Sequence, residues 1–436
     1  MGRNNKLTFL KVIFTYALFS PSFYNYLDTK GLAIVNGGLI ILFVIYFIMR
    51  RIRKIYFHTK MEKLLFLFIL FSFVLYFILI GISSLINNSK NLTLLDIADY
   101  NKPAVMLISF IFPFITLERE NIHDFYKFTN RFFILSLFVI FIFGLFHLFG
   151  NDYLKKILSF YTKEDVLTTF RIATPFVNPY DLAIFLILIF THFIYFSLIT
   201  GRIKYAFVAF ISVVILLFTQ SRIGFVSLVY ASLLIYLFSL FGISKVKRAF
   251  PIITFAIIFL ALIYIVYKFY YLSYLFGGIQ SYLQGESFSS WDIRKSQIEF
   301  VVNTMEKNIL AFLIGFGPAK DVIRYIENNH FYYFFRYGFI GWFFFFIFPS
   351  VLGIIYSFRS IRIVQNVYEK AFYFSILIWF ITIISVASLG NNFSEQMRLS
   401  FFYHFFIGTA IRNYYIHKNW RKNDGKSKCV YNNSCI

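Results

Sequence analysis

The sequence predicts an all-α membrane protein that crosses the bilayer many times, and its composition and apolar patterning support this fold class. Of 436 residues, 59% are hydrophobic and only 14% are charged, whereas soluble domains average about 45–50% and about 25%. The mean hydropathy is +0.71. Apolar stretches near the length of a membrane-spanning helix, about 20 residues, recur along the whole chain. This composition excludes a soluble globular protein and a disordered chain.

Twelve stretches are predicted to cross the membrane as helices, because each is mostly apolar and close to the required length. They are residues 7–27, 32–49, 64–86, 103–117, 132–149, 180–199, 205–219, 223–242, 249–269, 331–357, 371–389 and 398–416. The fourth and the seventh are the shortest. No internal repeat or low-complexity linker divides the chain, so residues 1–436 are predicted to form a single integral membrane domain.

Lysine and arginine are concentrated in alternate connections between these stretches, notably in residues 50–63, 243–249 and the tail 417–436. Basic connections of this kind tend to lie in the cytoplasm, so both termini are predicted to be cytoplasmic. Topology and anionic membrane lipid then account for most of the formal net charge of +22. We therefore predict no nucleic-acid partner.

Two long connections, residues 150–179 and 270–330, are left on the extracytoplasmic side, where loops on a rigid scaffold often carry binding and catalysis. In the second loop, apolar residues recur at helical spacing between charged ones, which predicts an amphipathic helix at the membrane surface. These apolar residues are Trp291, Ile298, Val301, Val302 and Met305.

Three arginines and one histidine are assigned to the outer face by this topology: Arg171, Arg222, Arg294 and His330. A guanidinium between two apolar runs, as at Arg222, is costly unless it is paired or functional. Arg171, Arg294 and His330 are individually also explained as ordinary loop residues. As a group they suit an anionic lipid-diphosphate headgroup, because guanidinium groups bind phosphate bidentately and stay charged. Arg336, further along, is better explained by snorkelling to lipid headgroups than by catalysis.

No nucleotide-binding or metal-binding signature is present. The P-loop pattern is missing, and Gly315-Phe316-Gly317-Pro318 lacks the third glycine of a dinucleotide fingerprint. The seven histidines are scattered, and the two cysteines lie near the end of the chain. His147, His192 and His404 fall within predicted helices, where we expect hydrogen-bonded interior side chains. We therefore predict neither a cofactor nor a metal ion.

Four stretches share their order and context with one known family. They are Arg171 to Pro179, Gln220 to Gly224, Trp291 to Arg294 with Gly315 to Gly317, and Asn328 to Gly341. With the twelve predicted spans and the large late loop, the chain resembles the bacterial O-antigen polymerase/ligase superfamily, which has a GT-C-like membrane fold. In the ligase branch, the histidine that ends the loop is usually followed by Asn, Ser or Gln. Here Phe331 follows, and Gly338 comes soon after, so the chain is more similar to the Wzy-type polymerases.

The resemblance implies a metal-independent glycosyltransferase in the bacterial inner membrane. Such an enzyme joins oligosaccharide repeat units at the periplasmic face, with both donor and acceptor carried on undecaprenyl diphosphate. A chain-length-regulating co-polymerase is a common partner. In this hypothesis Arg222 and Arg294 hold the diphosphate with help from Arg171, and either His330 or Glu327 acts as the base. The residues that would line the substrate are Asn328, Tyr332 and Arg336.

Two other functions stay open. An O-antigen ligase would use the same donor but transfer the polymer to the lipid A core. A lipid-linked sugar flippase or another transporter would show paired ionisable residues within its spans, or inverted repeats with broken helices. The long loops lie on one side of the predicted topology, which favours chemistry at one face.

Overall fold

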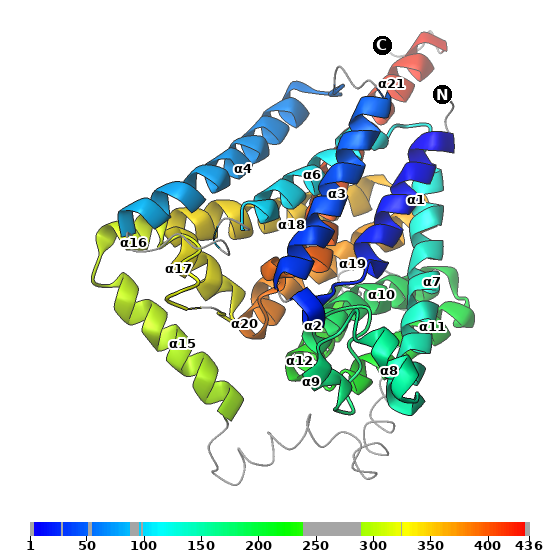
Figure 1. Ribbon diagram of the computed structural model, residues 1–436. Coiled ribbons are helices and arrows are strands. Elements are labelled where there is room, and N and C mark those ends of the chain that lie inside the picture. Colours follow the sequence, from blue (N-terminus) through cyan, green and yellow to red (C-terminus); the bar gives the residue numbers. More distant parts are fainter. Residues whose placement is uncertain are drawn as a thin grey trace.

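The computed structural model describes residues 4–27, 29–50, 55–87, 96, 99–238, 289–323 and 325–431, and all regular secondary structure in these ranges is helical (Figure 1). The helices of the first half are α1 (Asn4–Phe19), α2 (Tyr24–Leu27), α3 (Thr29–Arg50), α4 (Lys60–Asn87), α6 (Asn101–Thr116), α7 (Ile122–Phe149), α8 (Asp152–Leu158), α9 (Glu164–Leu167), α10 (Pro179–Thr200), α11 (Ile203–Phe218) and α12 (Arg222–Phe238).

The described part of the second half contains two π-helical segments and one 3₁₀ turn in addition to α-helices. Its elements are α15 (Ser289–Met305), α16 (Ile309–Ile314), α17 (Asn329–Gly341), the π-helix η3 (Trp342–Ile347), α18 (Phe348–Ile363), α19 (Val367–Thr382), the π-helix η4 (Ile383–Ala387), α20 (Ser388–Gly390), the 3₁₀ helix η5 (Phe393–Glu395) and α21 (Met397–Tyr431). The helix predicted around Trp291 to Met305 is confirmed as α15, in which Val301 and Met305 are buried.

The predicted all-helical fold is confirmed among the described residues, and its apolar helices are compatible with a membrane protein. Among the residues that the structure describes, five helices are long and apolar enough to cross a membrane: Lys60–Ile86, Ile122–Phe149, Pro179–Thr200, Asn329–Ile363 and Val367–Gly390. Shorter apolar helices are Leu7–Phe19, Ile34–Ile48, Asn101–Thr116, Ile203–Phe218 and Arg222–Phe238. Every predicted stretch coincides at least in part with a helix except residues 249–269, which lie outside the described residues.

The first predicted stretch, residues 7–27, is wrong at its end, because α1 stops at Phe19. Pro21 has no amide hydrogen and cannot continue the helical hydrogen bonding. The Ser22 hydroxyl instead donates to the backbone oxygens of Phe160 and Tyr161, at 3.2 and 2.8 Å. The chain is therefore diverted at residues 20–23 onto the 150–179 loop.

The last predicted stretch, residues 398–416, lies within a longer helix. α21 continues through most of the predicted tail to Tyr431. No proline or glycine interrupts residues 417–424, whose lysines and arginines are good helix formers. The start of α1 and the end of α21 lie at the same end of the bundle (Figure 1).

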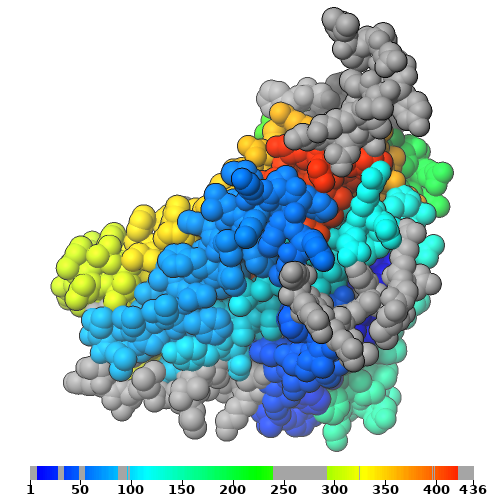
Figure 2. Space-filling model, turned by 90° about the horizontal axis from the view of Figure 1, so that it is seen from above, coloured from blue at the N-terminus to red at the C-terminus, as the bar shows by residue number. Residues whose placement is uncertain are grey.

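The interior of the bundle is built around α10, whose side chains are almost all buried. It packs against α11, α12 and α19, and the Tyr195 ring stacks on Phe374 with centroids 3.7 Å apart. α21 forms a second packing centre with α6 and α18. The outer helices carry exposed apolar residues such as Ile41, Phe71 and Phe138, as expected where lipid replaces water. Figure 2 shows one such helix, α4, running across the surface toward α16.

Candidate functional site

Residues 388–394, which include α20 and lead into η5, form a connection that contacts widely separated parts of the chain. Arg294 donates from its terminal nitrogen to the Gly390 carbonyl at 3.5 Å. A Cβ placed on Gly390 would lie 3.1 Å from Cγ1 of Ile223, next to Arg222. Asn328 donates to the Leu389 carbonyl at 3.2 Å. We call residues 388–394 the hub segment, because three of the four family-like stretches meet there.

The fourth stretch, Arg171 to Pro179, reaches the hub segment through the start of α10. Asn391 donates from Nδ2 to Oδ1 of the buried Asp181 at 2.9 Å. The same stretch also docks on the corner between α11 and α12. There, the Arg171 Nε donates to the Thr219 carbonyl at 3.4 Å, and the Ile172 amide donates to the Phe218 carbonyl at 2.9 Å. Arg171 therefore lies beside the corner at which Arg222 begins α12.

Arg294 and Glu327, both predicted as site residues, form an ion pair. Nε of Arg294 lies 2.7 Å from Oε2 of Glu327, and the two side chains are 18% and 43% exposed. The backbone amide of Glu327 donates to Oε1 of Gln297 at 3.1 Å, which is a second link between α15 and the residues before α17. The pair is therefore held in place from both sides while its carboxylate stays accessible.

His330 is held by hydrogen bonds at both of its ring nitrogens. Nε2 lies 2.9 Å from the carbonyl oxygen of Ile384, and the Trp342 indole donates to Nδ1 at 3.2 Å. A carbonyl only accepts and an indole N–H only donates, so the hydrogen of a neutral His330 is on Nε2. Ile384 and Trp342 belong to the π-helical segments η4 and η3, and such segments are frequent at functional sites.

Asn328, predicted to line the substrate, caps the N-terminus of α17. Its Oδ1 accepts from the amides of His330 and Phe331 at 2.9 and 3.2 Å. Side-chain caps of this type satisfy amides that otherwise lack a helical partner. Since its Nδ2 is bonded to Leu389, the side chain orients the start of α17 relative to the hub segment.

Tyr332 and Arg336, also predicted to line the substrate, lie in a separate group of buried charges. Arg336 is fully buried, and its guanidinium carbon is 5.3 Å from the centre of the Tyr332 ring. Oδ1 of Asp99 lies 2.8 Å from Nζ of Lys320 and 3.1 Å from Nζ of Lys102. We call Asp99, Lys102, Lys320 and Arg336 the buried charge cluster. It links the N-terminal side of α6 to the loop before α17.

The buried charge cluster predicts acid-dependent stability. Burial alone would raise the pKa of Asp99, but Lys102, Lys320 and Arg336 together hold this pKa below its ordinary value of 3.8. A lowered pKa stabilises the fold at neutral pH, and this contribution is lost as the pH falls through the lowered value. We expect Asp99→Asn to unfold at a lower temperature than wild type at pH 7, measured in detergent. The difference should disappear well below pH 3.8, and an unchanged difference there would contradict the assignment.

Two glycines from separate family-like stretches lie back to back. Gly315 has φ +75° and Gly338 has φ +65°, values that favour glycine. A Cβ on Gly315 would collide with the backbone of Arg336, and a Cβ on Gly338 with the backbone of Leu313. The amide of Gly317 also donates to the Arg336 carbonyl at 2.7 Å. The loop after α16 and the kink in α17 therefore interlock through backbone atoms.

The three histidines expected in the interior are hydrogen-bonded there, as predicted. His147 Nε2 lies 3.0 Å from the Thr169 carbonyl, and His404 Nδ1 lies 2.8 Å from the Ser400 carbonyl. His192 Nε2 lies 3.2 Å from Oδ1 of Asn130. The second ring nitrogen of each is buried without a partner among the described residues.

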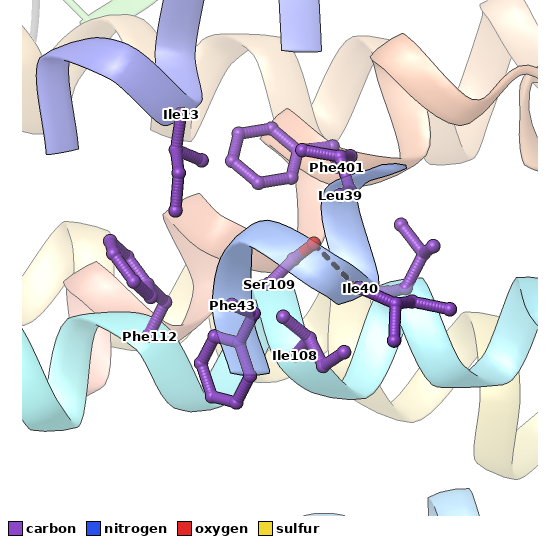
Figure 3. A pocket seen from close by; sticks show the side chains of 9 residues that line it. Ile13, Leu39, Ile40, Phe43, Ile108, Ser109, Phe112 and Phe401 are labelled. Carbon is purple, nitrogen blue, oxygen red and sulfur yellow. Dashed lines mark hydrogen bonds between the residues drawn. The ribbon is translucent and has the colours of Figure 1, made fainter. Parts of the chain in front are cut away.

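A small apolar pocket lies between α1, α3, α6 and α21 (Figure 3). Its lining is Ile13, Leu39, Ile40, Phe43, Val105, Ile108, Ser109, Phe112 and Phe401. The one polar side chain, Ser109, donates to the Val105 carbonyl of its own helix at 2.6 Å. This pocket offers nothing to bind a charged or sugar-containing group, so it is not the polar site.

Sequence reasoning did not identify the hub segment, the buried Asp181 or the partners of Arg336. One signal was available: Gly390-Asn391-Asn392 directly follows an apolar stretch and is rich in turn-forming polar residues. Among the residues that the structure describes, no three His, Cys, Asp or Glu side chains are grouped to hold a metal ion. Comparison with protein-family models, with curated proteins and with solved structures found no match for this chain.

Proposed function

We propose that this chain is a Wzy-type O-antigen polymerase, a GT-C-like glycosyltransferase with about twelve spans in the bacterial inner membrane. It joins repeat units carried on undecaprenyl diphosphate at the periplasmic face, and both of its termini are cytoplasmic. One observation carries this proposal: three of the four family-like stretches meet at the hub segment, and the fourth leads into α10, whose Asp181 is bonded to Asn391 of that segment. The α20 part of that segment lies away from the end of the bundle where α1 begins and α21 ends (Figure 1).

The arginines suit the departure of a lipid diphosphate. In the transfer, an acceptor hydroxyl oxygen bonds to the anomeric carbon of the donor sugar, and the bond from that carbon to the diphosphate oxygen breaks. The diphosphate leaves with the electron pair. Arg294 and Arg222, assisted by Arg171, would stabilise the charge that develops on it. The donor arrives already activated, so the chemistry needs no nucleotide site.

The hydroxyl proton needs an acceptor, and the geometry favours Glu327 over His330. Both nitrogens of His330 are engaged, so accepting a proton there would require it to break its bond with Trp342. Glu327 is 43% exposed and bonded to Arg294. A diphosphate that competes for Arg294 would release the Glu327 carboxylate to accept the proton. His330 is then a positioning residue that holds α17 against η4.

This assignment predicts different outcomes for two conservative substitutions. Glu327→Gln is expected to lower the rate of polymerisation about 100-fold or more, within the range of lost general-base catalysis, while donor binding is retained. His330→Asn is expected to lower the rate less and to lower the unfolding temperature as well. The rates are compared with purified protein and lipid-linked repeat units. An inactive His330→Asn beside an active Glu327→Gln would assign the base to His330 instead.

The function itself is tested by the lipopolysaccharide of a strain that lacks this gene, with and without complementation. We expect the ladder of polymer to be replaced by lipid A core that carries a single repeat unit. Bare core, with polymer left on the lipid carrier, would instead identify a ligase. An unchanged ladder would contradict both activities and favour a transporter or another glycan.

A further inference from the structure

Three buried polar side chains have atoms without a hydrogen-bond partner among the described residues. Two of them, Asn392 and Ser388, belong to the hub segment, and the third is its neighbour Asn329. These atoms are Oδ1 and Nδ2 of Asn392, Nδ2 of Asn329 and Oγ of Ser388. The side chains are 7%, 0% and 0% exposed, respectively. Native proteins pair nearly all buried polar groups, and each one left unpaired lowers stability. Atoms of this kind also occur elsewhere among the described residues, but three such side chains at one segment beside Arg294 point to a partner other than the protein chain.

The residues that carry these atoms belong to one short segment and to a neighbour hydrogen-bonded to it, and the same segment contacts Arg294. Oδ1 of Asn329 accepts from the hydroxyl of Ser394 at 2.7 Å, so the Asn329 amide lies against the hub segment that contains Asn392 and Ser388. Gly390, between Ser388 and Asn392, accepts from Arg294. A ligand whose phosphate lies at Arg294 would thus place its next chemical group beside these amides.

The atoms without partners identify the chemistry of that group. An asparagine supplies one acceptor and two donors, and a serine hydroxyl both donates and accepts. A phosphate offers only acceptors, so it would leave the Asn392 oxygen unpaired. Sugar hydroxyls both donate and accept, and neighbouring hydroxyls match the two ends of a planar amide.

We propose that Asn392, Asn329 and Ser388 form a sugar subsite, which binds hydroxyls of the repeat unit next to its diphosphate. This inference rests on the proposed function and adds to it the residues that distinguish a sugar-bearing lipid from the bare carrier. The sugar hydroxyls would donate to Oδ1 of Asn392 and accept from the two amide nitrogens. The sugar thereby supplies the partners that the buried groups lack.

The test compares two probes on purified full-length protein: undecaprenyl diphosphate, and the undecaprenyl-diphosphate-linked repeat unit extracted from the deletion strain. Wild type should bind the sugar-bearing lipid more tightly. Asn392→Leu, which keeps the branched shape of the side chain but removes the amide, should reduce that preference about 10-fold, the effect expected from losing one or two hydrogen bonds. Its affinity for bare undecaprenyl diphosphate should be unchanged. Ser388→Ala is a second, smaller change and should reduce the preference about 3-fold.

Ser136→Ala is the matched control, because this buried hydroxyl of α7 also lacks a partner among the described residues but lies outside the hub segment. It should leave the preference unchanged. Unfolding temperatures separate a binding role from a structural one. An unchanged preference in both hub variants, with lowered unfolding temperatures, would overturn the sugar subsite and assign these groups to internal water. A wild-type protein that binds neither lipid would contradict the proposed function as well.

Discussion

Replacing Arg294 by alanine is expected to lower polymer formation about 100-fold or more while the protein still folds and inserts. Removing one group that stabilises charge in a transition state typically costs this much. Arg294 is 18% exposed, contacts Glu327 and lies beside the hub segment, so it is reachable by a diphosphate. Polymer is measured in the deletion strain complemented with each variant, and the amount of protein in the membrane is measured in parallel.

Lys295→Ala is the matched control, because Lys295 is the next residue of α15, is 65% exposed and pairs only loosely with Glu299 at 3.9 Å. It should leave the polymer unchanged. A second control is the charge exchange that combines Arg294→Glu with Glu327→Arg. If the ion pair served only to hold α15, this exchange would restore the polymer. We expect it to remain inactive, and a restored ladder would contradict the assigned roles.

The largest loss of stability is expected from Arg412→Met, which breaks a buried ion pair. A terminal nitrogen of Arg412 lies 2.7 Å from Oε1 of Glu62, and the side chains are 4% and 0% exposed. The guanidinium also donates to the carbonyls of Tyr56 and Leu117, at 2.8 and 3.2 Å. Arg412 thus joins α21 to the start of α4 and the end of α6. Removing one partner of a buried pair leaves the other charge uncompensated, at a cost of about 3–5 kcal/mol.

This loss is measured as a change in the free energy of unfolding in detergent. Adding Glu62→Leu to Arg412→Met should recover much of the stability, because no buried charge is then left unpaired. The exposed pair of Lys295 and Glu299 provides a contrast, since Lys295→Ala should change the stability by less than about 1 kcal/mol. Equal stabilities of the single and double Arg412 variants would contradict this explanation.

Apolar length and composition were sufficient to predict the helices but not where each one ends. The stretch 64–86 lies within α4, and 180–199 lies within α10, because a run of apolar residues can satisfy its backbone only as a helix. The break after Phe19 depends on the contact of Ser22 with residues far along the chain. Pro21 was a local signal for that break.

The site was predictable in its chemistry but only partly in its arrangement. Arg294 and Glu327 were both selected, and the structure places them in direct contact. Arg336 was selected with them, yet its position beside Asp99 depends on the packing of α6 against the loop before α17. The hub segment was missed because its role arises from contacts with residues roughly 60 to 210 positions away, such as Asn328 and Asp181. Such distances are not encoded in local patterns.

The back-to-back contact of Gly315 and Gly338 limits how this protein can be recombined with others. Neither backbone leaves room for a Cβ on the glycine that it contacts. The shapes of the two segments are therefore complementary. A chimera that exchanges residues 329–341 to alter substrate choice should therefore import residues 313–317 from the same parent. A chimera that takes the two segments from different parents would pair surfaces that are not complementary. Such chimeras should accumulate poorly even when every residue at the reaction centre is retained.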